Sequence, residues 1–209
     1  MKISSIIPCH SSHVSKLQNL VSNLNENQTK KPDEIIIVVN PRVEVKINSS
    51  IPLKIIYENR CTPGRARNLG AEVAEGDLLI FFDADDFYHK NRIEIIDMCF
   101  SSTEAAAAVH GYVHHDASIL SNDIIMPPSF SEATADSNNN TNLAEPTSNF
   151  PIHHGHASFK KSIFKQFKYR EDLVPGEDGE LLRRVCATGN KVMCILEKLS
   201  VYAPSNSWR

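Results

Sequence analysis

The chain has 209 residues, which is enough for one α/β domain with a sizeable core. Its content of 41% hydrophobic and 22% charged residues is typical of a globular protein and argues against a disordered one. The net charge of −3 argues against the broad basic surface of a nucleic-acid-binding protein. The five cysteines are scattered and form no CxxC pair, so we expect neither a disulfide framework nor a zinc knuckle.

Apolar runs and helical spacing alternate over residues 3–100. The expected strands are 3–7 (ending at Pro8), 34–39, 53–58 and 77–82, and the expected helices are 12–24, 62–76 and 91–100. In the helix from Thr62, one face is expected to contain Ala66, Leu69, Gly70 and Val73, and Gly76 is the expected stop. This alternation predicts a mostly parallel sheet with helices on both faces.

Polar residues follow three of the expected strands. They are Cys9-His10 after the first, Asn40 after the second and Asp83-Ala84-Asp85-Asp86 after the fourth. Ligands of such sheets bind beyond the carboxyl ends of the strands, so we expect these residues to converge on one edge.

Asp83, Asp85 and Asp86 repel one another, so their grouping calls for a nearby positive charge. Carboxylates at a strand end suit Mg²⁺ or Mn²⁺, which keep positions open for substrate phosphates. The alternative is that these aspartates cap the following helix or form a solvated turn.

The second half is less regular. Residues 113–150 are polar and rich in Asn, Ser, Thr and Pro, which predicts a long mobile loop. A helix ending at Gly189 and a strand at 191–196 are expected after it. We expect a single domain over residues 1–209.

Four stretches together resemble the successive motifs of family 2 glycosyltransferases of the GT-A fold. They are "IIPCHSSH", "EIIIVVN", "NRCTPGRARNLGAEVAEGDLLIFFDADD" and "VPGEDGELLRRV". The resemblance covers residues 3–207 and is most specific from Asn59 to Asp86. It implies an inverting, Mg²⁺- or Mn²⁺-dependent transfer of a sugar from a nucleoside diphosphate sugar, with a UDP-sugar as the expected donor. The implied acceptor is a carbohydrate or a lipid-linked molecule.

The resemblance also implies roles for residues of the donor site. Asp85 would hold the metal with support from Asp86, and Asp83 would contact the nucleoside. The remaining residues implied to contact the donor nucleotide are Pro8, His10, Asn40, Gly64 and Arg67. Arg67 would lie near the donor phosphates or near the carboxylates of Asp83 and Asp85.

Three of these roles have alternatives. His10 is equally suited to a turn that enters a helix, and Arg67 to an ion pair that holds its loop. Asn40 stands where the family usually has an aspartate that reads the base, so the base preference stays open.

Glu177-Asp178 resembles the acidic pair that supplies the family's general base. An inverting displacement needs a base on the face opposite the leaving group. Asp178 is the expected base and Glu177 the second choice. The alternative is that both acids complement the dipole of the helix they begin.

The histidines of "HHGH" raise the question of zinc, but no second Cys/His pair supports such a site. By resemblance, His154 and His156 border the sugar and acceptor pocket. The terminal "VYAPSNSWR" departs from the family by having Ala203 and no histidine, so one usual metal ligand is expected to be missing.

Two other functions remain open. A sugar nucleotidyltransferase would need a glycine-rich basic loop where "PCHSSH" stands. A non-catalytic nucleotide-sugar-binding protein is favoured by Asn40 and by the missing late histidine. The apolar stretch before Pro8 is too short for a signal peptide, and no run approaches the roughly 20 apolar residues that span a bilayer. We therefore expect a cytoplasmic protein, with peripheral attachment to the inner membrane face left open.

Overall fold

The computed structural model describes residues 1–114, 116, 118, 120, 122–124, 126–133 and 157–202. The strands are β1 (Ile3–His10), β2 (Glu34–Asn40), β3 (Leu53–Tyr57), β4 (Leu78–Phe81), β5 (Phe87–Tyr88), β6 (Ala107–His114), β7 (Phe130–Glu132), β8 (Ser158–Lys160) and β9 (Val192–Tyr202). The helices are η1 (Ser11–His13), α1 (Val14–Ser22), η2 (Asn23–Asn27), α2 (Pro63–Val73), α3 (Arg92–Ser102), α4 (Lys161–Phe164) and α5 (Glu177–Ala187).

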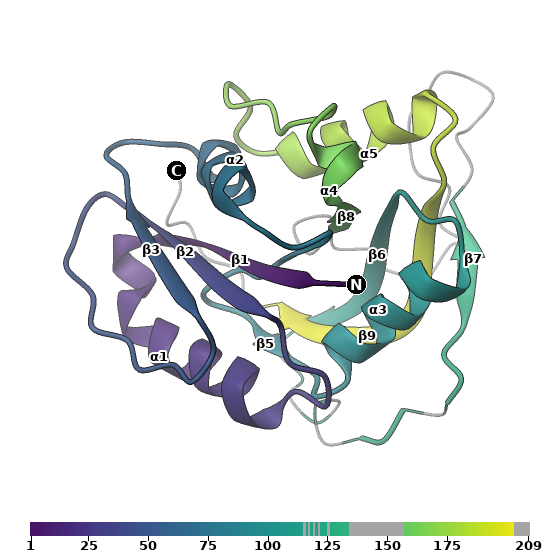
Figure 1. Ribbon diagram of the computed structural model, residues 1–209, viewed down its shortest axis with the longest axis horizontal. Helices are drawn as coiled ribbons and strands as arrows, with labels where there is room; N and C mark the ends of the chain where they lie inside the picture. Colours follow the sequence, from purple (N-terminus) through teal and green to yellow (C-terminus); the bar gives the residue numbers. More distant parts are fainter. Residues whose placement is uncertain are drawn as a thin grey trace.

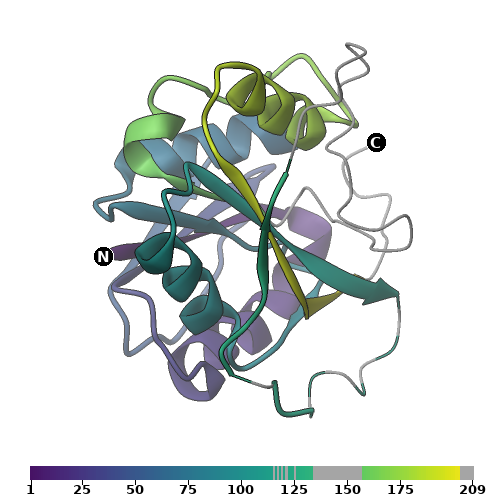
Figure 2. The ribbon, with the colours of Figure 1, turned by 90° about the vertical axis from the view of Figure 1, so that its right-hand side faces the viewer.

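Among the described residues, the strands form one curled sheet in the order β3-β2-β1-β4-β8-β6-β9-β5, with β7 paired to β9. Strands β1 to β4 are parallel to one another. Strand β8 runs antiparallel to both β4 and β6, which gives β6 and its parallel neighbour β9 the direction of β4. The described sheet is therefore mostly parallel, as predicted, and Figure 2 looks onto its β6, β7 and β9 end.

Helices cover both faces of the sheet, which confirms the predicted α/β class. Figure 1 shows α1 and α3 on one face and α2, α4 and α5 on the other. Strand β2 is buried along its whole length. Its Ile35 and Ile37 pack in the same core cluster as Leu17 of α1, whereas Ile36 packs with Ala71 of α2. This explains why the sequence of β2 shows no polar alternation.

Strand β1 passes through Pro8 and ends at His10, so the predicted stop at Pro8 is wrong. The carbonyl of Ile6 accepts a hydrogen bond from the backbone N–H of Phe82, 2.9 Å away, on the β4 side. Pro8 lies two residues further on and faces the same side, where pairing with β4 has ended at Ile6 and Phe81. The missing N–H of Pro8 therefore removes no hydrogen bond from the sheet.

Helix α2 ends at Val73, three residues before the predicted stop. Of the four residues predicted to form one face, Ala66 and Gly70 are buried, Leu69 is half-buried and Val73 is exposed, so the predicted face is confirmed at Ala66 and Gly70 and wrong at Val73. Gly70 lets the helix approach β1 and β2 closely, and Arg67 is also buried.

Part of the segment predicted as a loop over 113–150 is regular. Strand β6 continues to His114, and β7 occupies Phe130–Glu132 beside β9. Residues 134–150 lie outside the described part of the chain, and the mobility of the segment stays a prediction. None of the helices in the described ranges is long and apolar enough to cross a membrane.

Candidate functional site

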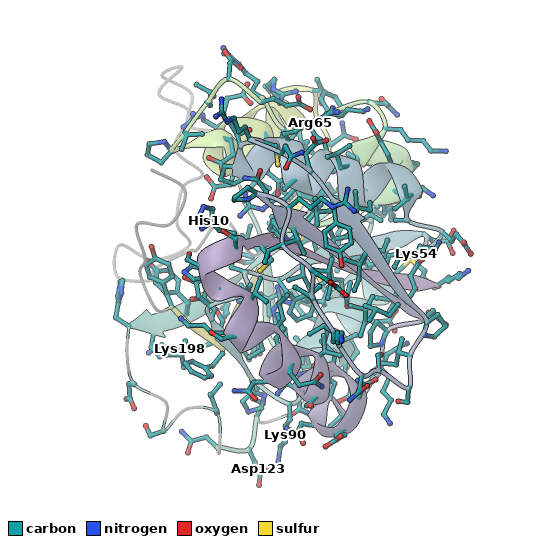
Figure 3. The ribbon with its side chains drawn as sticks, turned by 90° about the vertical axis from the view of Figure 1, so that its left-hand side faces the viewer. His10, Lys54, Arg65, Lys90, Asp123 and Lys198 are labelled. Atoms are coloured by element: carbon teal, nitrogen blue, oxygen red, sulfur yellow. The ribbon has the colours of Figure 1, made fainter. Side chains whose placement is uncertain are left out.

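The polar residues at the carboxyl ends of β1 and β2 and just after β4 lie at one edge of the sheet, as predicted. His10 pairs with Asn40 in the parallel register of β1 and β2, and Ile6 pairs with Phe81 at the end of β4. Figure 3 shows His10 beside the start of α1, with Lys54 of β3 toward the opposite edge of the molecule.

The turn after β4 is fixed by Tyr88. The Tyr88 hydroxyl accepts a hydrogen bond from the backbone N–H of Asp83 (2.6 Å) and donates one to the Asp83 carbonyl (2.9 Å). The backbone N–H of Asp86 also donates to that carbonyl (3.3 Å), and the Asp86 side chain is buried. These bonds hold the backbone of the acidic turn without using the Asp83 carboxylate.

Arg67 of α2 joins the acidic turn to helix α5. Its guanidinium is buried and donates to Asp83 Oδ1 (2.9 Å) and to Glu177 Oε1 (2.8 Å), while it also lies 5.3 Å from the centre of the Tyr169 ring. Burial would lower the pKa of Arg67, but the nearby acidic groups, Asp83 first, outweigh burial and raise that pKa. The structure therefore places Arg67 beside the Asp83 carboxylate, which is one of the positions predicted for it, in an ion pair that also includes Glu177.

The two acids that begin α5 differ in their surroundings. Glu177 is buried against Arg67. Asp178 is only half-buried, and its Oδ1 accepts a 2.7 Å hydrogen bond from the backbone N–H of Gly179 in its own turn. Gly176, just before the helix, has φ +105°, a conformation that L side chains rarely adopt, so a glycine is required there. This entry places both acids at the first turn of the helix.

Asp85 points toward the start of α1. Its Oδ2 lies 3.7 Å from Nδ1 of His13, and the two side chains are 13% and 11% exposed. Burial and the charge of Asp85 together raise the pKa of the nearby Cys9 thiol to about 12. No group of three or more His, Cys, Asp or Glu side chains able to hold a metal occurs among the described residues.

The predicted nucleotide-binding residues all lie at this edge or in α2, but several have structural contacts. His10 Nδ1 accepts a 3.3 Å hydrogen bond from the backbone N–H of Ser12, which is the predicted alternative of a helix-entry turn. Asn40 pairs with the backbone of Cys61 by two 2.9 Å hydrogen bonds, one donated and one accepted.

Gly64 permits a close backbone approach, as predicted, but in the described structure the neighbour is protein. A Cβ at this position would lie 2.9 Å from the carbonyl oxygen of Arg170. Pro8 is buried within β1. The implied contacts of these residues with a nucleotide stay predictions, and His154 and His156 lie outside the described residues.

Sequence reasoning missed three residues beside the acidic turn. Tyr88 braces it as described above. Arg92 is fully buried, donates to the Phe81 carbonyl (3.0 Å) and to His110 Nε2 (2.8 Å), and has its pKa lowered to about 10 by burial. Tyr202 ends β9, and burial together with the charges of the acidic turn raises its pKa. Arg92 could have been identified from the sequence, because a cationic residue soon after three acids indicates a charge partner. Tyr202 could be identified only once the pairing of β9 was known.

The fold matches solved structures of one glycosyltransferase from Staphylococcus aureus. A crystal structure of TarS residues 1–349 in complex with UDP superposes with a TM-score of 0.67 at 16% identity, covering 98% of this chain and 61% of that one. The corresponding complex with UDP-GlcNAc also gives 0.67, at 14% identity, covering 99% of this chain and 59% of that one. At these identities the similarity establishes the fold alone.

Sequence comparison finds the same relative. Poly(ribitol-phosphate) beta-N-acetylglucosaminyltransferase TarS from two Staphylococcus aureus strains is 26% identical over 103 residues, which is 45% of this chain and 18% of TarS. This chain thus aligns with less than a fifth of the length of these relatives. Residues 4–167 match the sequence model of glycosyl transferase family 2. Because this match spans most of the sequence, the chain belongs to glycosyl transferase family 2.

Proposed function

We propose that the chain transfers a sugar from a nucleoside diphosphate sugar, with a UDP-sugar as donor, to an acceptor hydroxyl with inversion. The observation that carries this proposal is the bridge made by Arg67, which brings Asp83 and Glu177 together from distant parts of the sequence. In this proposal, one site contains both the acidic turn that binds the donor and the acids of α5 that act on the acceptor hydroxyl. The solved TarS complexes with UDP and UDP-GlcNAc support this class of donor.

A divalent cation fits the acidic turn if the substrate supplies most of its ligands. Asp85 is a hard oxygen donor that accepts no hydrogen bond from any described residue, whereas Asp83 is engaged by Arg67. Mg²⁺ and similar ions are commonly held by one or two carboxylates together with substrate phosphates and water. We therefore propose that Asp85 holds Mg²⁺ or Mn²⁺ and that buried Asp86 supports the turn. When bound, the ion would stabilise the charge of the leaving diphosphate.

Asp178 is the better candidate for the base. Its carboxylate is half-buried and has Oδ2 outside the hydrogen bond to Gly179. Glu177 is buried and accepts a charge-assisted hydrogen bond from Arg67 at 2.8 Å, so that oxygen is already engaged within the protein. We propose that Asp178 takes the proton of the acceptor hydroxyl during attack and that Glu177 holds Arg67 in place.

The donor nucleotide is proposed to lie along Pro8, His10, Asn40, Gly64 and Asp83. The Asn40 amide has one N–H beyond the bond it donates to Cys61, so it can still contact a base. The acceptor is proposed to be a carbohydrate or a lipid-linked molecule, and His154 and His156 remain candidates for contacting it.

A thermal-shift panel of UDP, GDP, ADP and CDP with and without Mn²⁺ tests the donor class. A ligand that binds only the folded protein raises its melting temperature, so we expect the largest shift with UDP and Mn²⁺ together. Slow release of UDP from UDP-sugars by water then tests catalysis. Binding without turnover on water or any acceptor would favour a nucleotide-sugar-binding protein, and equal shifts for all four nucleotides would contradict the choice of UDP.

A further inference from the structure

His13 is a buried histidine beside the acidic turn, and the proposed function gives it no role. It is the last residue of η1 and is 8% exposed. Its ring lies 6.5 Å from the ring of His10, and its Nδ1 faces Asp85 Oδ2 at 3.7 Å. Neither ring nitrogen of His13 forms a hydrogen bond with the described residues.

The distance between His13 and Asp85 suits a shared cation better than a direct bond. At 3.7 Å, Nδ1 and Oδ2 are too far apart for a hydrogen bond, whose usual limit is about 3.2 Å. The same distance is less than twice a metal–ligand bond of about 2.1 Å, so one ion can contact both atoms. The structure thus places one nitrogen and one oxygen donor, each on a largely buried side chain, facing each other.

His10 is less suited to this role than His13. Its Nδ1 already accepts a hydrogen bond from the backbone N–H of Ser12 and lies 2.8 Å from the Ser12 hydroxyl. The His10 side chain therefore serves the turn that starts η1, which in turn carries His13 toward Asp85. The two histidines of "PCHSSH" therefore have different roles: His10 stabilises the turn, and His13 faces Asp85.

We propose that His13 is a second protein ligand of the divalent cation held by Asp85, and that its nitrogen makes the site prefer Mn²⁺ to Mg²⁺. Mg²⁺ strongly prefers oxygen ligands, whereas transition metals accept an imidazole nitrogen more readily. With only two ligands from the described protein, the ion keeps positions for diphosphate oxygens and water. This inference rests on the proposed metal-dependent function and adds the identity of a ligand.

Pulsed electron paramagnetic resonance of Mn²⁺ bound to the protein with UDP tests the proposal directly. In the wild type, the electron spin echo of Mn²⁺ should be modulated by a directly coordinated imidazole nitrogen. His13→Leu should lose this modulation and weaken Mn²⁺ binding by at least about tenfold, with a smaller effect on Mg²⁺. His114→Leu, which removes an exposed histidine from the end of β6, is the control and should keep the signal.

The Asp85→Asn variant tests the proposed metal site independently of the role of His13. Unchanged Mn²⁺ binding in Asp85→Asn would overturn the metal site itself. Loss of binding in Asp85→Asn, with nitrogen modulation and affinity retained in His13→Leu, would overturn only the role of His13. If His13→Leu does not fold, His13→Gln keeps a polar side chain of similar size, and persistence of the imidazole signal there would equally overturn the proposal.

Discussion

At the scale of single residues, Arg67 determines how the acidic groups of the site are held. Its guanidinium is the one positive group that an ion pair joins to both Asp83 and Glu177 among the described residues. The side chains of Arg67 and Glu177 are 6% and 8% exposed, so solvent screens this pair weakly. Removing Arg67 would take away the positive charge that pairs with both carboxylates.

Arg67→Leu should therefore destabilise the fold by about 3–5 kcal/mol, as expected when one partner of a buried ion pair is removed. Urea unfolding followed by circular dichroism measures this change. Arg65→Leu is the matched control, because Arg65 lies in the same helix and pairs with Glu171 across 3.4 Å with both side chains exposed. It should cost about 0–1 kcal/mol, and equal losses in the two variants would contradict the central role of Arg67.

The different surroundings of Asp178 and Glu177 predict different defects. Asp178→Asn should keep donor binding and stability but slow transfer, or donor hydrolysis by water, by roughly 10²–10⁴-fold, because the general base is lost. Glu177→Gln should lower stability first, since the amide cannot replace the charge that faces Arg67. Rates of UDP release and melting curves for both variants give the comparison. Wild-type hydrolysis by Asp178→Asn would exclude it as the base and favour a role at the helix dipole.

The sequence was informative about which residue types meet at this site and less so about their contacts. The ends of three parallel strands were predicted to converge because strand direction fixes one edge of the sheet, whereas the acids of α5 were assigned to the site only by resemblance to the family. The partners of Arg67 and Asn40 depend on how α2 and the loop after β3 pack, which no local pattern encodes. Tyr202 was missed because it reaches the acidic turn only through the pairing of β9 with β5 and β6.

At the scale of elements, the segment after α2 shows why a glycine can be misinterpreted. Gly76 was predicted to stop the helix, as glycines in left-handed conformation often do. In the structure the helix ends at Val73, and Gly76 is not among the residues with positive φ in the described chain. Its backbone N–H donates to the Ser4 hydroxyl at 2.8 Å, which brings this segment against the start of β1.

Gly76→Ala should consequently destabilise the fold through a steric clash. A Cβ there would lie 2.7 Å from the backbone nitrogen of Ser4 and 2.9 Å from the carbonyl oxygen of Lys2, and backbone atoms cannot move aside cheaply. We expect a loss of about 1–3 kcal/mol in urea unfolding. Val73→Ala, at an exposed position nearby, should stay within about 0.5 kcal/mol of the wild type. An alanine tolerated at position 76 would mean that the two segments are less tightly packed than described.

At the scale of the whole molecule, the first half of the fold was predicted more completely than the second half, where the sequence indicated α5 and the start of β9 but not the strands β5 to β8. Strands β1 to β4 are largely apolar runs, and helices follow β1 and β3 in the chain, so this alternation predicts a parallel arrangement. Beyond β4 the sheet is extended by β8, β6, β9 and β5, whose order in space differs from their order in the chain. Short strands such as β5 and β8 are recognised only by their pairing in the sheet, because a pattern of two or three residues does not identify a strand.

The edge opposite the candidate site is held by a buried carboxylate, and this makes the molecule sensitive to acid. Glu34 begins β2 and accepts hydrogen bonds from the Ser4 hydroxyl (2.7 Å), the backbone N–H of Glu75 (2.5 Å) and Lys54 (3.1 Å). These contacts join β1, β3 and the segment after α2 at one point. Burial alone would raise the pKa of Glu34, but the hydrogen bonds and the charge of Lys54 outweigh burial and lower that pKa below 4.5.

Because the pKa of Glu34 is lower in the folded than in the unfolded protein, its stabilisation should be fully present above about pH 5 and lost as the pH falls through the folded value. Glu34→Gln should cost about 1–2 kcal/mol at pH 7, and the difference from the wild type should shrink toward pH 3. Urea unfolding at several pH values measures both. Glu104→Gln is the control, since Glu104 pairs with Lys191 but is 84% exposed, and it should change neither the stability nor its pH dependence. A difference between Glu34→Gln and the wild type that stays constant from pH 7 to pH 3 would show that the charge of Glu34 does not hold this edge.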